Sequence, residues 1–227
     1  MNRSHLDTEL RLLKDGLLAM AGVAEEMIKL TMKAYSEKSD QLAEQVVGMD
    51  EELDNMEIRL DQTCIDLLAL QSPMASDLRF VTSAIKILPD IERIGDHCTN
   101  IAKRAPLLNH VERILPGGLL DDLGAETSSM MRRSVEAFVA YDPNIAREVI
   151  KGDDKVDDLY HQCYRELLRQ MVSDPLCIER ASHLIIVIKN WERIADMATN
   201  IAEEVLFIIE GVNAKHQHLH LQKENST

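Results

Sequence analysis

The chain has 227 residues, enough for one large domain or for two domains of about 110 residues each. Hydrophobic residues make up 45% and aromatic residues only 4%, a composition typical of helical proteins whose cores are filled by aliphatic and Met side chains. The formal net charge is −14 and no Lys/Arg cluster reverses it locally, which argues against nucleic-acid binding.

The amino-terminal stretch MNRSHLDTELRLLKDG lacks the apolar run of a signal peptide. No segment approaches the roughly 20 apolar residues that span a bilayer. We therefore expect a cytoplasmic protein that does not span a membrane.

The four cysteines include no Cys-x-x-Cys pair, which favours reduced, buried thiols over disulfides or a zinc site. They are Cys64, Cys98, Cys163 and Cys177.

Amphipathic periodicity predicts three helices in the first half of the chain. They span roughly residues 6–35, 41–70 and 78–105. The turn QSPMASD at residues 71–77 precedes the third helix. Pro89 lies within that helix and lacks a backbone donor, so we expect a kink or a restart there. A connector framed by Pro106 and by the Pro-Gly-Gly sequence at 116–118 ends this unit.

The same order of elements is predicted in the second half. Helices are expected over roughly residues 119–140, 145–171 and 176–209, separated by the turns YDPN and SDP. The rest of the chain is polar and is expected to be a flexible tail. Its alternating histidines fit such an end better than a metal site. They are His216, His218 and His220.

Two segments show that the halves are copies of one unit. ERIGDHCTNIA at residues 92–102 returns as ERIADMATNIA at residues 192–202, with eight of eleven letters unchanged. VVGMDEELDNM at residues 46–56 aligns with VIKGDDKVDDL at residues 149–159. Two copies are too few for a solenoid, so we predict an all-α fold of two tandem, similar three-helix bundles, six helices in all. The expected boundaries are 1–108 for the first repeat, 109–118 for the connector, 119–211 for the second repeat and 212–227 for the tail.

The repeated segments carry acids on one helical face. With Glu92 at zero on a helical wheel, Asp96 falls near about 40° and Asn100 near about 80°, whereas the apolar residues lie between about 180° and 240°. Glu192, Asp196 and Asn200 repeat this pattern. The wheel therefore predicts an acidic stripe that faces solvent.

Each acidic stripe has a partner on the preceding helix. Asp54 and Glu92 both lie 19 residues from Pro73, and Asp50 and Asp96 both lie 23 residues from it. In an antiparallel hairpin, residues at equal distances from the turn lie level. The second half has nearly the same spacing about Pro175: Asp157 at 18 and Glu192 at 17, Asp153 at 22 and Asp196 at 21.

Four clustered carboxylates repel one another unless they spread into water, share protons or bind a cation. Oxygen ligands suit hard or borderline ions, so the candidates are iron, manganese, magnesium and zinc. The alternative is a plain solvated surface, because acids at i and i+4 are common on exposed helices. The placement in both halves favours one open cation site in each.

Other chemistries find less support in the sequence. A ferritin-like di-iron centre needs Glu-x-x-His on two helices, and that spacing does not occur. The sequence also lacks a Walker loop, a dinucleotide fingerprint and a nucleophile elbow. We therefore expect no enzyme. A metal-dependent enzyme and a metal-binding helical adaptor remain the alternatives.

The chain resembles the PhoU family of phosphate-uptake regulators from about residue 10 to 211. The resemblance rests on SPMASDLR at residues 72–79, ERIGDHCTNIA, ERIADMATNIAEEVLFIIEG at residues 192–211, and the two Asp-x-x-x-Asp segments. It implies two similar three-helix bundles, with iron or another metal on acidic surface motifs. One site would comprise Asp50, Asp54, Glu92 and Asp96. The other would comprise Asp153, Asp157, Glu192 and Asp196.

The resemblance also implies a physiological role. Such a protein would be a cytoplasmic accessory of a phosphate-specific ABC transporter and would restrain phosphate uptake through the transporter ATPase. It would also help a sensor histidine kinase to hold the phosphate-starvation response off. The long helices allow a homodimer but do not require one.

Overall fold

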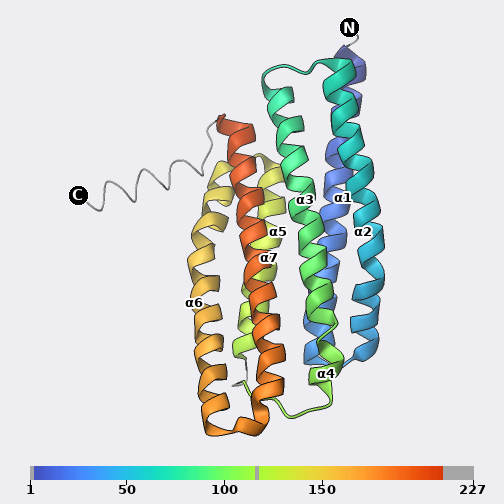
Figure 1. Ribbon diagram of the computed structural model, residues 1–227. Coiled ribbons are helices and arrows are strands. Elements are labelled where there is room, and N and C mark those ends of the chain that lie inside the picture. Colours follow the sequence, from blue (N-terminus) through green and yellow to red (C-terminus); the bar gives the residue numbers. More distant parts are fainter. Residues whose placement is uncertain (1–2, 116–117, 212–227) are drawn as a thin grey trace, which may run out of the picture.

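The protein is described by a computed structural model over residues 3–115 and 118–211 (Figure 1). Every regular element in these two ranges is helical, as the sequence predicts. Six helices are long: α1 (Arg3–Ser36), α2 (Asp40–Asp66), α3 (Ser76–Ala102), α5 (Leu119–Ala140), α6 (Pro143–Ser173) and α7 (Ile178–Glu210). Three elements are short: a π-helical turn η1 (Leu67–Gln71), α4 (Ala105–Asn109) and a 3-10 turn η2 (Pro175–Cys177).

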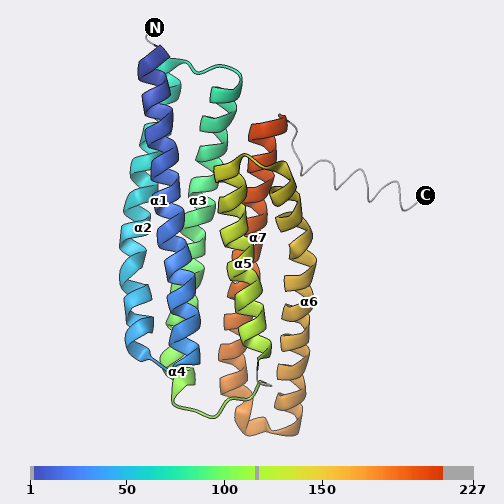
Figure 2. The ribbon, with the colours of Figure 1, turned by 180° about the vertical axis from the view of Figure 1, so that it is seen from behind.

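The long helices form two three-helix bundles that lie side by side. Helices α1, α2 and α3 make one bundle and α5, α6 and α7 make the other (Figures 1 and 2). The bundles meet where α3 packs against α7 and α1 against α5. The predicted class, an all-α tandem of similar bundles, is therefore confirmed.

Local capping explains where several helices begin and end. Ser39 accepts a hydrogen bond from the Leu42 backbone N–H at the start of α2, and Asp142 accepts one from Asn144 at the start of α6. Left-handed residues close other helices, Tyr141 after α5 and Gly211 after α7. These caps place the turns within a few residues of the predicted positions.

Two expectations about the end of the first unit need revision. Helix α3 does not restart at Pro89 but continues through it, because the rest of its hydrogen-bonded ladder and a buried apolar face hold it. It also ends at Ala102, earlier than predicted. The chain then forms the short helix α4, with Pro106 in its first turn, where a missing N–H costs nothing. The tail at 212–227 and its three histidines lie outside the described residues.

The core is aliphatic and continuous through both bundles. Trp191 is buried, and so are all four cysteines, which form no disulfide, as the sequence predicts. Burial raises the pKa of the Cys64 thiol to about 12, so this group stays protonated and inert at neutral pH. Across residues 3–115 and 118–211, no helix carries an apolar stretch of the length and hydropathy that a bilayer crossing requires.

Close packing positions α2 against α3. A Cβ atom on Gly95 would lie 2.4 Å from Cδ2 of the fully buried Leu53. In the second half, Gly95 corresponds to the larger Ala195, and Leu53 corresponds to the smaller Val156. The total side-chain volume at this contact is therefore similar in the two halves, but its distribution between the two paired helices differs.

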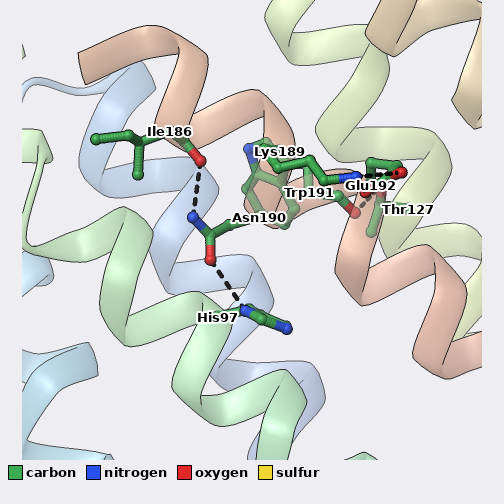
Figure 3. Close-up of polar contacts among 7 residues, drawn as sticks. All are labelled: His97, Thr127, Ile186, Lys189, Asn190, Trp191 and Glu192. Atoms are coloured by element: carbon green, nitrogen blue, oxygen red, sulfur yellow. Dashed lines mark hydrogen bonds and ion pairs between the residues drawn. The ribbon is translucent and has the colours of Figure 1, made fainter. Parts of the chain in front are cut away.

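Buried polar contacts tie the two bundles together. Glu204 on α7 accepts hydrogen bonds from Ser83, at 3.0 Å, and from Lys86, at 2.9 Å, both on α3. Lower on the same seam, His97 Nδ1 donates to Asn190 Oδ1 at 2.9 Å, and Asn190 Nδ2 donates to the Ile186 carbonyl (Figure 3). These bonds fix the register of α3 against α7.

Candidate metal-binding faces

The hairpin of α2 and α3 brings the first four predicted acids into one neighbourhood. The pKa of Glu92 on α3 rises to about 7, because the side chain is half-buried and because it feels neighbouring negative charges. Those charges are Asp96, Glu57, Asp54 and Asp50. Since three of them lie on α2, the carboxylates of the two helices face one another across the hairpin.

Asp50 is the best anchored member of this first face. Burial raises its pKa, and the charges of Asp54 and Asp96 act in the same direction. The buried Thr99 donates a hydrogen bond to Asp50 Oδ1 at 3.1 Å, which holds the carboxylate in place and partly offsets that rise. One carboxylate of the cluster is thereby pre-positioned from the core side.

The hairpin of α6 and α7 repeats the arrangement. Burial raises the pKa of Asp196 to about 6, with further contributions from Glu192, Asp153 and Asp157. The pKa of Asp153 is also raised, first by burial and then by the charge of Asp157. The second set of predicted residues is therefore also brought together.

The two faces differ in their countercharge. Lys189 Nζ donates to both carboxylate oxygens of Glu192 at 2.6 Å, an ion pair that Figure 3 shows along α7. One hundred positions earlier, the equivalent residue is Pro89, which carries no charge. Glu92 thus lacks the cation that its counterpart has next to it. On the first face the nearby cation is instead Lys103, which acts on Asp50, and the second half has Glu203 at the equivalent position.

Both faces are open to solvent but not fully exposed. Asp54, Asp96 and Asp157 are exposed, while the other five predicted ligands are half-buried against the neighbouring helix. The helical wheel predicts an outward stripe, and the structure adds that the acids of paired helices lie near one another. An ion could reach either face directly from water.

The ligand atoms of the two faces suit a hard cation, but the acidic side chains do not converge on one point. Carboxylate oxygens on two helices with a hydroxyl behind them are the ligand types that magnesium, manganese or iron bind. Among the described residues, however, no three His, Cys, Asp or Glu side chains converge closely enough to hold an ion. A shared ion would require the exposed carboxylates to rotate toward the half-buried ones.

Sequence reasoning missed several members of these faces. Thr99 donates a hydrogen bond to Asp50 and lies in the Thr-Asn-Ile-Ala sequence that returns at residues 199–202, so this repeat was the available signal. Glu57 contributes to the field at Glu92. The asymmetry between Lys189 and Pro89 could have been read from the alignment of the two copies.

Comparison with known proteins places this geometry in a family. The PhoU domain profile matches the chain twice, at residues 17–105 and 120–205. The phosphate-specific transport system accessory protein PhoU homolog of Aquifex aeolicus is 38% identical over 211 residues, 93% of this chain and 96% of that protein. The homolog of the same name from Pseudomonas aeruginosa is 34% identical over 220 residues, covering 96% of this chain and 90% of the relative.

Solved structures show the same architecture. A crystal structure of PhoU from Pseudomonas aeruginosa matches with a TM-score of 0.87 at 34% identity, covering 91% of this chain and 99% of that chain. The phosphate transport system regulatory protein PhoU from Streptococcus pneumoniae matches with a TM-score of 0.84 at 28% identity, covering 92% and 99%. Two PhoU repeats thus account for both bundles.

Proposed function

This chain belongs to the PhoU family, and on that premise we propose that it is a non-enzymatic regulator of phosphate homeostasis. It acts in the cytoplasm as the accessory protein of a phosphate-specific ABC transporter and restrains phosphate uptake through the transporter ATPase. It also keeps phosphate-starvation signalling repressed through a sensor histidine kinase. Self-association as a homodimer stays a prediction, which sedimentation would test.

One observation carries the proposal more than any other. Relatives at 34% to 38% identity, aligned over more than nine-tenths of this chain, are named as accessory proteins of phosphate-specific transport systems. The alignment leaves no room for an additional domain in the described part, so the role has to be exercised by helical surfaces. The two acidic faces, one in each half, are the most distinctive of these surfaces.

Deletion of the encoding gene tests the regulatory role. In cells grown with ample phosphate, we expect a rise in both phosphate transport and alkaline phosphatase, and restoration of both by the intact chain. Unchanged levels in the deletion strain would argue strongly against the proposal. Phosphoester or peroxide turnover by the purified protein that disappears in the Asp96→Asn plus Asp196→Asn variant would argue for the enzyme alternative.

We further propose that each acidic face binds a cation, with iron, manganese, magnesium and zinc as candidates. The supporting facts are the raised pKa values of Glu92 and Asp196, because crowded carboxylates gain from a positive partner. When bound, the ion would supply charge compensation between paired helices. Asp50, which accepts a hydrogen bond from Thr99 on the core side, would be the fixed ligand of the first face.

Elemental analysis of protein purified without chelator tests this second proposal. We expect metal in the intact chain and little in the Asp96→Asn plus Asp196→Asn variant. Asp15→Asn plus Asp122→Asn is the matched control, because both residues are exposed, lie on other helices and change the net charge equally. Equal metal content in all three proteins would reduce the acidic faces to solvated surface.

A further inference from the structure

A cavity of about 470 Å³ opens at one end of the seam between the bundles, away from both acidic faces. It lies among the first turns of α3, the N-terminal half of α1, the turn after α5 and the last turn of α7. Its volume is within the range of small-molecule sites, about 300 to 1,000 Å³. None of its lining residues is one of the predicted metal ligands.

Three cations line this cavity in a protein whose net charge is −14. Arg11 and Lys14 come from α1 and Arg79 comes from α3. Of the ion pairs formed within residues 3–115 and 118–211, none includes any of these three. Arg79 is held in place, because its Nε donates to the Ile208 carbonyl at 3.2 Å, in the last turn of α7.

Aromatic rings lie next to these cations. The chain has three Phe, four Tyr and one Trp, and three of these eight rings stack together at this one place. The centroids of Phe80 and Phe138 are 5.9 Å apart and those of Phe138 and Tyr141 are 6.4 Å apart. Lys14 Nζ lies 4.3 Å from the Tyr141 centroid, and 44% of Tyr141 is exposed. Phe80 and Tyr141 both line the cavity.

One carboxylate, that of Asp77, shares the cavity with the cations. It lies in the first turn of α3, where a negative charge complements the helix dipole. A carboxylate repels a bare inorganic anion but accepts hydrogen bonds from sugar hydroxyls, as acidic residues do in dinucleotide sites. Cations, exposed aromatic surface and one hydroxyl acceptor together match a ligand with phosphoryl, planar and sugar parts.

We propose that this cavity binds a nucleoside phosphate of mononucleotide size. The phosphoryl group lies among Arg11, Lys14 and Arg79, whose charged donors bind phosphate oxygens strongly. The planar base lies against the aromatic and aliphatic lining, and Asp77 accepts from the ribose. The site does not depend on the phosphate-regulatory role, so either proposal can fail without the other.

Calorimetric titration of the full chain with AMP tests the proposal. We expect saturable binding that weakens as the salt concentration rises, because charge pairing contributes to it. Arg11→Gln plus Lys14→Gln should raise the Kd about tenfold or more, since two charged hydrogen-bond donors are lost. Adenosine and inorganic phosphate, titrated separately, should each bind at least about tenfold more weakly than AMP.

The control variant is Lys29→Gln plus Arg132→Gln, which removes the same charges from exposed positions outside the cavity. It should bind AMP like the intact chain. Circular dichroism confirms that both variants are folded, and the salt dependence of the intact chain provides a readout that needs no variant. The proposal is overturned by absent AMP binding at millimolar concentration, by equal losses in the two variants, or by adenosine or inorganic phosphate binding as tightly as AMP.

Discussion

Replacing Glu92 by Gln should stabilise the metal-free protein at alkaline pH and leave it nearly unchanged at acid pH. In the folded chain, the pKa of Glu92 is raised from 4.5 to about 7 by burial and by neighbouring carboxylates. Between these values the folded state holds a proton that the unfolded state has lost. The free energy of unfolding therefore falls as the pH rises from 4.5 to 7, and Gln removes that loss.

The size of the effect follows from the shift in pKa. Moving from 4.5 to about 7 corresponds to at most about 3.4 kcal/mol, at roughly 1.36 kcal/mol for each pH unit. Glu92 is only half-buried, so solvent screens its charge and reduces the effect to about 1 to 1.5 kcal/mol. At pH 4.5 the variant and the intact chain should differ little, because the folded carboxyl group is then protonated.

Urea denaturation with EDTA at pH 4.5 and at pH 8 measures this difference. Glu26→Gln is the matched control, because Glu26 is exposed on α1 and lies outside the acidic faces. Its effect should be small and the same at both pH values. If Glu92→Gln changed the stability equally at both pH values, or destabilised the chain at pH 8, the inferred crowding of carboxylates would be wrong.

Three further substitutions test the packing and the seam. Gly95→Ala should cost about 1 to 2 kcal/mol by urea denaturation because its Cβ meets Leu53, and adding Leu53→Val should recover most of the loss; no recovery would refute the proposed sharing of volume. Burial lowers the pKa of His97 from 6.5, so the intact chain loses stability as the pH falls below 6.5, and His97→Gln should show less of this loss between pH 7.5 and 5.5. Glu204→Leu should cost about 1 to 3 kcal/mol in the same assay, because Ser83 would be left buried without its acceptor, and a neutral result would mean that the seam does not need this bond.

Much of the fold is contained in local sequence signals. The apolar periodicity of α5 predicts both of its ends, and the turn residues around Pro73 and Pro175 locate both hairpins. Pro89 gave the misleading signal, because local propensity favours a break there, whereas the buried face of α3 and its contacts with α7 keep the helix continuous. Such contacts between distant segments are not encoded in local sequence patterns.

The candidate metal-binding faces could also be predicted in part from the sequence. Distance from the turn was enough to pair α2 with α3, because antiparallel helices rise at equal rates per residue. The cavity at the seam was not readable, because Lys14, Arg79 and Tyr141 come from three separate segments without a shared motif. Packing within the first bundle brings Lys14 and Arg79 together, and the packing of one bundle against the other adds Tyr141.

The claim that each half carries its own cation site is tested most directly by titrating manganese into metal-free protein, using the intact chain and variants of each acidic face. We expect the Asp96→Asn variant to lose binding at the first face alone and Asp196→Asn to lose it at the second alone. Each single variant should then retain about half of the stoichiometry of the intact chain, and the double variant should retain almost none. Unchanged stoichiometry in the double variant would show that the paired carboxylates are not the ligands.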